Sequence, residues 1–425
     1  MKRFSLLILS VFLLASPSFA NHITGGEVYY TYVGPSGSGY QYHVTLKLFR
    51  DHFSTGAMLD PTAALAVFDR ITGAMIWNGN IVKTREVQLQ LTSPSPCINN
   101  PPVVYYDVGY YEFDLILPDS PNGYIIAYQR CCRIAGINNL ANSVSVGTTY
   151  SAEIPGNSSL STAPQNNSAQ FVGADTVIVC AHNQFSYSFA AQDADGDRLS
   201  YSFCDAFIGG NSTTQPAPNP PAAPPYFVVP YASPFSGSQP LGNTVSLDPT
   251  TGLITGIAPD AGIYVVTVCV TETRNGVVIA TQRKDLQIKV GDCDVARALL
   301  NPQYITCDGF TMTFQNLSTS PLINSYFWDF GVPVTNADTS NLAIPTFTYP
   351  DTGAYTIKLV TNRNQQCSDS TTAIVKVYPG FFPAFNSIGI CVTNPVRFTD
   401  ATSTVYGVVD TWSWNFGDAT TAGDT

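Results

Sequence analysis

The chain has 425 residues, enough for about three domains at roughly 150 residues each. Charged residues make up only 12% of it, whereas 32 glycines, 30 prolines, 23 tyrosines and 24 phenylalanines favour short strands and turns over helices. A formal net charge of -11 would repel a nucleic-acid backbone, and no apolar run in the body is long enough to cross a membrane. Composition therefore predicts an all-β protein and argues against a nucleic-acid partner or a transmembrane segment.

The first twenty residues predict a secretory signal peptide. Lys2 and Arg3 precede the apolar stretch 4–15, and small residues stand before Asn21. A basic start, a short apolar core and a small-residue cleavage site are what signal peptidase requires, so we expect residues 1–20 to be removed and the chain to be secreted or extracellular. In that oxidising environment the ten cysteines are expected to form disulfides rather than to bind a metal.

Residues 21–160 predict an N-terminal β domain. Its clearest strand is 40–50, where an apolar side chain occupies every second position from Tyr42 to Leu48. A glycine-rich connection, residues 34–39, joins this strand to another at 25–33. The polar run 156–168 shows no periodicity and marks the expected end of the domain.

A second β domain is expected over residues 169–292. Asn275-Gly276 lies between two apolar strands and predicts a type I′ hairpin, because these two residues tolerate positive φ. The insertion 211–242 contains nine prolines, which remove hydrogen-bond donors and fix φ. We therefore expect this insertion to form a long, extended surface loop.

The last part of the chain contains a repeat. Trp328-Asp329-Phe330-Gly331 recurs 86 residues later as Trp414-Asn415-Phe416-Gly417, and Cys307 recurs 84 residues later as Cys391. Two markers at nearly the same spacing predict tandem domains, 293–379 and 380–425. Because only 11 residues follow Trp414, the second copy is expected to be truncated and the chain to be a fragment of a longer protein.

The motif 326–331, followed by residues 345–359, resembles the polycystic-kidney-disease (PKD) domain. This resemblance implies an immunoglobulin-like β-sandwich over 293–379. The alternation of residues agrees with it, because Trp328 and Phe330 share one strand face and Asp351-Thr352-Gly353 supplies a turn. Val332-Pro333 departs from the Gly-Asp-Gly that usually follows in the family.

The second domain resembles cadherin-like or immunoglobulin-like modules of bacterial surface proteins. The residues that carry this resemblance are Asp193-Ala194-Asp195-Gly196-Asp197 and the stretch 248–256. The whole order, from residues 22–27 through Tyr128-Gln129-Arg130-Cys131-Cys132-Arg133, is similar to secreted proteins of gliding Bacteroidota. Those proteins are chains of PKD repeats that end in a type IX secretion sorting domain, so the resemblance implies a gliding-motility-associated protein attached to the cell surface.

Three carboxylates, Asp193, Asp195 and Asp197, lie within five residues and suggest a calcium site. The spacing is not that of an EF-hand, because Gly falls at the fourth position and Cys204 at the twelfth. The preferred interpretation is an Asp-rich turn whose side chains accept hydrogen bonds from backbone N–H groups, and calcium remains the alternative cofactor.

The sequence offers little for catalysis. The four histidines do not form a HExxH motif, and neither a GxSxG motif nor a phosphate-binding glycine loop occurs. Glu112 and Asp114 share a strand face, but a solvated face opposite a core stripe explains them better than a pair of glycosidase carboxylates. We therefore expect no catalytic residues and no enzymatic activity in this chain.

The cysteines are assigned domain by domain. Cys307 with Cys367 is the preferred pair, and Cys391 is expected to lack its partner in this chain. Cys204 with Cys269 and Cys180 with Cys293 is one of three connectivities open to four cysteines. Cys131 and Cys132 should point to opposite faces of a strand, so that one meets Cys97 and the other pairs elsewhere, with a vicinal disulfide or a reactive thiol as the alternatives.

These observations favour a secreted or cell-surface adhesion protein whose β-sandwiches act as spacers and binding modules. Its expected partner is an extracellular protein or a polysaccharide. Aromatic residues in loops, Tyr105-Tyr106 and Pro224-Pro225-Tyr226-Phe227, could stack on sugars or anchor a protein, or simply pack beneath a loop. The alternative function is a non-catalytic binding region of a larger secreted enzyme.

Overall fold

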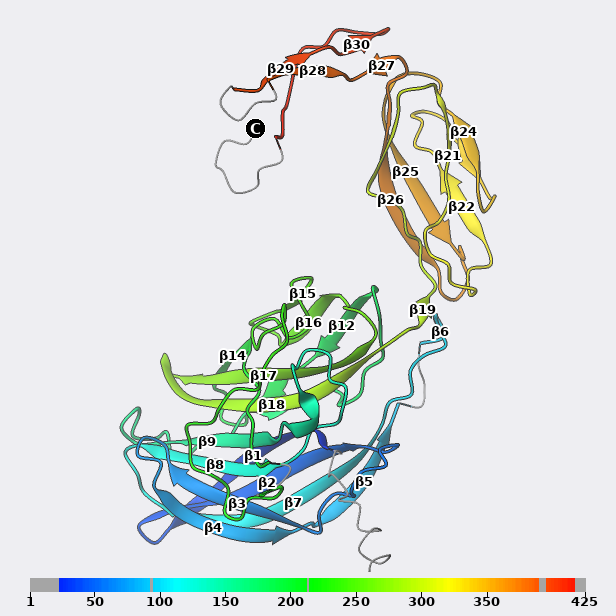
Figure 1. Ribbon diagram of the computed structural model, residues 1–425. Coiled ribbons are helices and arrows are strands. Elements are labelled where there is room, and N and C mark those ends of the chain that lie inside the picture. Colours follow the sequence, from blue (N-terminus) through cyan, green and yellow to red (C-terminus); the bar gives the residue numbers. More distant parts are fainter. Residues whose placement is uncertain (1–22, 92–94, 212–213, 390–394, 417–425) are drawn as a thin grey trace, which may run out of the picture. The chain divides into compact units, whose positions relative to one another are not determined.

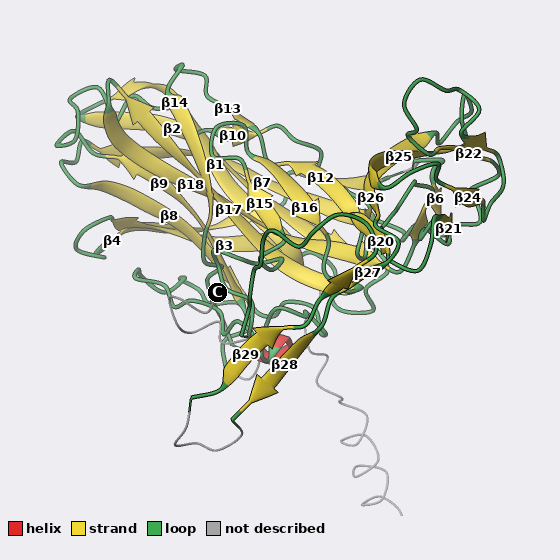
Figure 2. Cartoon of the chain, turned by 90° about the horizontal axis from the view of Figure 1, so that it is seen from above, coloured by secondary structure: helices red, strands yellow, loops and turns green. Residues whose placement is uncertain are grey.

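The computed structural model describes residues 23–91, 95–211, 214–389 and 395–416. The expected signal peptide 1–20 and Cys391 lie outside these residues. Strands and loops make up almost all of the described chain, with a short 3₁₀ helix at Ser143–Ser145 (Figure 2). No helix in the described part is both long and apolar enough to span a membrane. The chain divides into two compact units, and the second consists of Ser95–Asn99 together with Asp294–Thr425.

The first unit is built on an eight-stranded sheet flanked by two smaller sheets (Figure 1). The strands of the large sheet, in spatial order, are β14 (Arg198–Phe203), β17 (Gly262–Arg274), β18 (Val277–Gly291), β1 (Ile23–Ser36), β2 (Gly39–Asp51), β7 (Tyr105–Pro118) and β5 (Arg85–Gln90), with β11 (Val179–Cys180) pairing to β18. A four-stranded sheet contains β4 (Met75–Val82), β3 (Thr62–Asp69), β8 (Gly123–Arg130) and β9 (Thr148–Pro155). A three-stranded sheet contains β12 (Gln184–Ser188), β16 (Leu253–Ile257) and β15 (Val245–Leu247), and a short pair is formed by β10 (Gln170–Phe171) and β13 (Ala191–Gln192).

The two small sheets pack on opposite faces of the large sheet, which makes three layers. Successive side chains of a strand point to opposite faces. In β7, Tyr111 and Leu115 enter the core shared with the four-stranded sheet, whereas Tyr106 and Val108 enter the core shared with the three-stranded sheet. The unit is therefore a pair of immunoglobulin-like sandwiches that share their central sheet.

The structure merges the two domains that were expected at 21–160 and 169–292. Their boundary disappears because β1 pairs with β18, with Gly25 opposite Leu286. The polar run 156–168 is not a linker, since Ser168 exchanges hydrogen bonds of 2.8 and 3.0 Å with the backbone of Tyr30. In the sequence, the missing periodicity of this run indicated a linker. The run lacks periodicity because its polar side chains form hydrogen bonds with neighbouring strands.

The expected hairpins are present. Asn275 and Gly276 both adopt positive φ, 53° and 80°, and connect β17 to β18 as a two-residue loop. The first connection is shorter than the glycine-rich run suggested, because Ser36 already pairs with Gly39. Positive φ at Gly37 makes this tight reversal possible without strain.

Four charged side chains are buried together on the face of the large sheet that meets the three-stranded sheet. Lys47 lies 2.7 Å from Asp175 and 3.4 Å from Glu27, and Lys284 contacts the same two carboxylates. Burial lowers the pKa of Lys47, but the carboxylates of Glu27 and Asp175 raise it more, so the amine stays charged. Mutual neutralisation is what allows these charges to lie between layers.

The second unit contains an immunoglobulin-like sandwich of two sheets (Figure 1). One sheet has the order β20 (Gln303–Thr306), β26 (Asp369–Val377), β25 (Gly353–Thr361), β22 (Tyr326–Asp329) and β23 (Thr339–Ser340), and the other pairs β21 (Thr311–Thr313) with β24 (Thr346–Thr348). The pairs β6 (Ile98–Asn99) with β19 (Asp294–Val295), β27 (Phe381–Phe382) with β30 (Ser403–Thr404), and β28 (Phe385–Ile388) with β29 (Arg397–Asp400) complete the unit.

The core of this sandwich follows the alternation seen in the sequence. Trp328 and Phe330 are both buried in it, and Ile357 and Leu359 of β25 pack in the same cluster. The indole Nε1 of Trp328 donates a hydrogen bond of 2.9 Å to the carbonyl oxygen of Leu342, so the buried ring leaves no unpaired donor.

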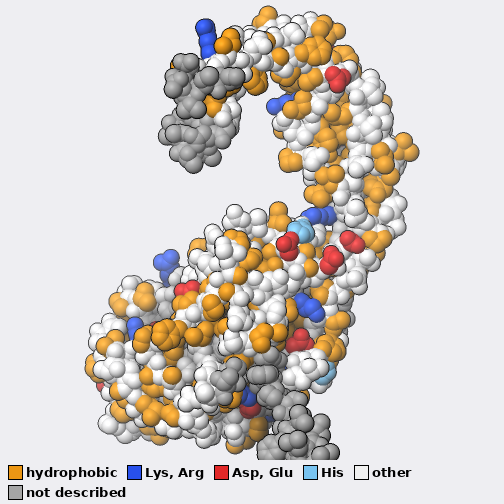
Figure 3. Space-filling model, viewed as in Figure 1, with side chains coloured by type: hydrophobic (Ala, Val, Ile, Leu, Met, Phe, Trp, Pro, Cys, Tyr) orange, Lys and Arg blue, Asp and Glu red, His pale blue; other side chains and the backbone are white. Residues whose placement is uncertain are grey.

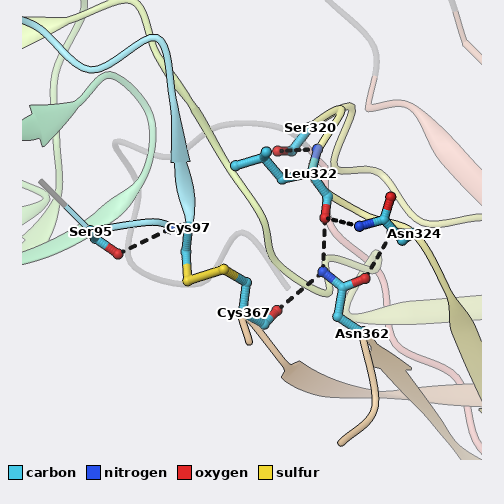
Figure 4. Close-up of a disulfide and its surroundings, with 7 residues drawn as sticks. All are labelled: Ser95, Cys97, Ser320, Leu322, Asn324, Asn362 and Cys367. Carbon is cyan, nitrogen blue, oxygen red and sulfur yellow. Dashed lines mark hydrogen bonds between the residues drawn. A yellow bond between two sulfur atoms is a disulfide. The ribbon is translucent and has the colours of Figure 1, made fainter. Parts of the chain in front are cut away.

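Cys367 forms its disulfide with Cys97, so the expected pair of Cys307 with Cys367 is wrong (Figure 4). β20 runs parallel to β26, with Thr306 opposite Val377, which places Cys307 beyond the end of β26. Cys367 precedes the start of that nine-residue strand, at Asp369. At about 3.3 Å per residue the two cysteines lie about 30 Å apart, far beyond the reach of a disulfide.

The other disulfides lie in the first unit. Cys180 is joined to Cys293 and Cys204 to Cys269, which is the connectivity considered from the sequence. Cys131 is joined to its neighbour Cys132, so neither of them meets Cys97. The expectation from strand alternation failed because β8 ends at Arg130, one residue before the pair.

Residues 380–389 and 395–416 form short strand pairs with exposed side chains. Phe385, Trp412 and Phe416 are each more than half exposed. The described residues of this segment therefore contribute little buried area. Over the face drawn in Figure 3, charged side chains are sparse and hydrophobic ones are scattered among uncharged polar groups.

Candidate functional site

A pocket of about 550 Å³ opens on the outer face of the four-stranded sheet in the first unit. Segments far apart in the sequence line it, namely the turn after β3, strands β8 and β9, the segment between β14 and the proline-rich insertion, the insertion itself, and β18. The lining residues are Arg70, Ile71, Thr72, Gly73, Ile125, Ser151, Glu153, Phe207, Pro224, Pro225, Tyr226, Thr281 and Arg283. The volume falls within the roughly 300–1,000 Å³ of small-molecule sites.

Strand alternation supplies the floor of the pocket. Ile126 of β8 and Ala152 and Ile154 of β9 face the core between the sheets. Their neighbours Ile125, Ser151 and Glu153 must point to the outer face, and these three line the pocket. The floor thus combines an apolar side chain, a hydroxyl group and a carboxylate.

The turn between β3 and β4 forms one wall. The Asp69 carboxylate accepts hydrogen bonds from the backbone N–H groups of Ile71 and Thr72, at 3.1 and 2.8 Å, and from Asn122 Nδ2. Gly73 closes the turn with a φ of 68°, where a side chain would be strained. These bonds fix the turn and present the Arg70 side chain to the pocket.

The proline-rich insertion forms the opposite wall and is anchored to the sheet. Tyr226 packs on Ala66, Phe68 and Ala127 of the outer face. The backbone N–H of Ala222 donates a hydrogen bond of 2.9 Å to Gln129 Oε1. The insertion is therefore a surface segment, as expected, but one held in place by a sheet rather than freely extended.

Arg283 is the most unusual group in the pocket. Its guanidinium carbon lies 3.7 Å from the centroid of the Phe207 ring, a cation–π contact. Its Nη2 donates hydrogen bonds to the carbonyl oxygen of Asp205 and, at 3.7 Å, to Cys204 Sγ. No carboxylate of the described residues forms a salt bridge with it. Burial lowers its pKa, and the carboxylates of Asp285, Glu153 and Asp205 oppose that decrease only in part. The pocket thus contains a partly buried cation that has carboxylates near it but forms a salt bridge with none of them among the described residues.

A second arginine, Arg70, forms an ion pair with the carboxylate of Glu153 in the pocket lining. Arg70 Nη1 lies 3.7 Å from Glu153 Oε2 and 3.4 Å from the carbonyl oxygen of Ile279. Glu153 Oε2 also accepts a hydrogen bond of 3.2 Å from the backbone N–H of Thr281. With Arg283 included, the lining residues carry two positive charges and one negative charge, although the whole chain is acidic.

Tyr226 supplies a hydroxyl group without a partner. Its Oη is buried and has no hydrogen-bond partner among the described residues. Burial raises the pKa of this phenol, so it remains a neutral donor and acceptor. Independently of this buried group, the lining residues combine cationic, anionic and hydroxyl-bearing side chains with flat apolar rings.

No protein-family model matches this chain, and no curated protein sequence matches it. Among solved structures it is similar to one titled "Structural basis for Dscam isoform specificity", at 9% identity and a TM-score of 0.15, over 85% of this chain and 99% of that chain. It is also similar to latent PorU from Porphyromonas gingivalis, at 13% identity and a TM-score of 0.17, over 83% of this chain and 34% of that chain. The fold assignment rests on the strands of the chain itself.

The structure brings Asp193, Asp195 and Asp197 together, with one carboxylate oxygen of each within 4.8 Å of the others. Asp193 Oδ1 accepts hydrogen bonds from the backbone N–H groups of Asp195 and Asp197, at 2.9 and 3.0 Å. This is the capped turn that the sequence favoured. The calcium alternative stays a prediction.

Arg274 contributes the positive charge to this acidic turn. Its Nη2 lies 2.6 Å from Asp197 Oδ2 and 2.9 Å from Asp195 Oδ2, and also donates to Asn166 Oδ1 at 2.7 Å. The guanidinium thus holds the turn against the end of β17 and the polar run 156–168. A structural salt-bridge cluster accounts for these carboxylates without a metal.

Glu272 lies close to this cluster and is fully buried. Its carboxylate accepts hydrogen bonds of 2.7 Å from the backbone N–H of Ala169 and from Asn166 Nδ2. Burial raises its pKa to about 7, and the nearby charge of Asp193 adds to the increase. Glu272 therefore joins the polar run to β17.

The carboxylates considered for catalysis are ordinary surface groups. Asp114 lies 2.8 Å from His43 Nδ1, and Glu112 accepts a hydrogen bond from Thr84 Oγ1 at 2.6 Å.

The two adjacent loop aromatics singled out in the sequence, Tyr105 and Tyr106, have different surroundings. Tyr106 packs in the core of the unit, whereas Tyr105 stacks on His52 with ring centroids 3.9 Å apart.

The sequence pointed to only part of the pocket. Pro224, Pro225 and Tyr226 stood out as loop aromatics and prolines, and the structure places all three in its wall. Arg70 and Arg283 were missed, because a single charged residue in a turn or on a strand gives no signal by itself. Only the packing of the insertion onto the outer face, and the approach of β18 to the edge strand β9, bring these groups together.

Proposed function

We propose that this chain is a secreted, cell-surface adhesion protein in which immunoglobulin-like sandwiches act as spacers and the first unit binds an extracellular ligand in its pocket. The observation that carries the proposal is the partly buried Arg283, which lines the pocket, stacks on Phe207 and forms no salt bridge with a carboxylate of the described residues. A buried cation is destabilising unless it is paired, so its retention suits a site that meets an anionic group.

The disulfides support an extracellular location. Cys180–Cys293 and Cys204–Cys269 cross-link the first unit and Cys97–Cys367 lies in the second. Such bonds persist in oxidising compartments and help small sandwiches to resist unfolding. They agree with removal of the expected signal peptide 1–20, which N-terminal sequencing of the secreted protein would test by a first residue of Asn21.

We also propose a more specific assignment of the domain type and of the export route. Burial of Trp328 and Phe330 in one core supports a PKD-type sandwich in the second unit. On that basis the chain would belong with the gliding-motility-associated proteins of Bacteroidota that leave the cell by type IX secretion. Loss of the protein from the surface of a strain without that secretion system is the expected result.

Binding of the full mature chain to an array of extracellular polysaccharides and surface proteins tests the function. We expect binding that is lost in the double variant Arg70→Met/Arg283→Met. The matched control is Arg85→Met, because Arg85 also stacks on a ring, 3.4 Å from the centroid of Tyr110, but lies outside the pocket. A chain that binds nothing on a broad array would contradict the binding role and leave only that of a spacer.

A further inference from the structure

We infer that the pocket binds a sugar residue bearing one carboxylate, a uronic acid of an extracellular polysaccharide, with the carboxylate at Arg283 and ring hydroxyl groups at Glu153. This inference rests on the proposed function, because it names the ligand class of the same pocket.

The carboxylate assignment follows from the N–H donors of Arg283 that form no hydrogen bond within the described chain. Its Nη2 is engaged with Asp205 and Cys204, which leaves Nε and Nη1 without a hydrogen-bond partner among the described residues. The Phe207 ring covers one face of the guanidinium and fixes its plane. A planar carboxylate matches the donors of a fixed guanidinium and forms short, charge-assisted hydrogen bonds with it.

The hydroxyl assignment follows from the other polar groups. Glu153 on the floor is an acceptor, and Ser151 and Thr281 beside it can both donate and accept. Sugar hydroxyl groups need such mixed partners in a small space. The carboxylate of Glu153 would also repel a second negative charge, so a ligand with one carboxylate among hydroxyl groups fits better than a dense polyanion or an acidic peptide.

The apolar walls suit the faces of a sugar ring. Pro224, Pro225 and Tyr226 present flat apolar surface across from the polar floor. Tyr226 adds a buried hydroxyl group that still lacks a hydrogen-bond partner among the described residues. A sugar ring with axial C–H groups on one face would stack on this apolar surface.

Calorimetry with the full mature chain tests the inference. The probes are tetragalacturonate, an oligomannuronate and an oligoglucuronate, each compared with its methyl ester, which keeps the ring but removes the charge. We expect at least one acid to bind at least tenfold more tightly than its ester. Arg283→Met should weaken that binding at least tenfold, whereas Arg85→Met should leave it unchanged. Unfolding temperatures equal to that of the wild type would show that both variants fold.

Three results would overturn the inference. One is equal affinity for acid and ester, another is uronate binding that is insensitive to Arg283→Met, and the third is tighter binding of an aspartate-rich peptide than of any uronate. Each of these leaves the proposed function intact if the array still yields a ligand that depends on Arg70 and Arg283. An array on which nothing binds the full chain would overturn both.

Discussion

The disulfide between Cys97 and Cys367 joins residues that are 270 positions apart in the sequence. The segment around Cys97 also pairs with the start of the second unit, Asn99 opposite Asp294. Ser95–Asn99 thus belongs to the second unit, although the chain on both sides of it belongs to the first. The bond fixes this segment to the loop that precedes β26.

Replacing both cysteines, Cys97→Ser with Cys367→Ser, should destabilise the second unit. Loss of a native disulfide typically lowers the free energy of unfolding by about 2–5 kcal/mol. Urea unfolding followed by tryptophan fluorescence would measure this change, because Trp328, one of the four tryptophans, is buried in the second unit and reports on its unfolding. Cys307→Ser is the control and should leave the Cys97–Cys367 bond in place. A Cys307–Cys367 cross-linked peptide in mass spectra of the non-reduced protein would contradict the structure.

Arg274→Gln should destabilise the first unit by about 2 kcal/mol, because it leaves Asp195 and Asp197 close together without a cation. In the wild type Arg274 already balances these carboxylates, so we expect millimolar Ca²⁺ and its chelation to leave the melting temperature unchanged. Differential scanning calorimetry with and without EGTA measures both effects. A clear rise in melting temperature with Ca²⁺ would instead favour a calcium site at Asp193, Asp195 and Asp197.

The stability of the first unit should fall as pH rises from 5 to 8. Burial raises the pKa of Glu272 to about 7, above its value near 4.5 in the unfolded chain, so the folded state holds the proton more tightly. This contribution is complete below the unfolded pKa and is lost as pH rises through 7, a change of about 3 kcal/mol. Asp193, whose pKa is also raised by burial, changes stability in the same direction.

Urea unfolding at pH 5 and pH 8 measures this dependence. Glu272→Gln removes the titrating group and should make the pH dependence shallower than in the wild type. Glu112→Gln, at the carboxylate bonded to Thr84 on the strand face, should keep the wild-type slope. Equal slopes for the wild type and Glu272→Gln would show that Glu272 does not titrate in this range.

Trp328→Ala should lower the free energy of unfolding of the second unit by about 3–5 kcal/mol, since it empties the centre of a packed core. Trp412→Ala is a matched control, because that indole is more than half exposed and its loss should change stability by less than about 0.5 kcal/mol. Thermal unfolding followed by near-UV circular dichroism would compare the two. Similar losses for both would contradict the burial difference.

The sequence by itself determined the local features of this protein. Alternation from Tyr42 to Leu48 defined a strand and its buried face, Asn275-Gly276 defined a hairpin, and Trp328 with Phe330 defined a sandwich core. Each of these depends on interactions between residues a few positions apart, or on the intrinsic φ preference of a residue, which is why composition and period were enough.

Only the tertiary structure decided the features that depend on distant segments. Pairing of Gly25 with Leu286 merged two expected domains, and the direction of β20 along β26 placed Cys307 out of reach of Cys367. The pocket likewise exists only because β18 carries Arg283 to the outer face that the proline-rich insertion covers. Strand order, register and side-chain pairing across such separations are set by packing and by loop closure, and no period in the sequence records them.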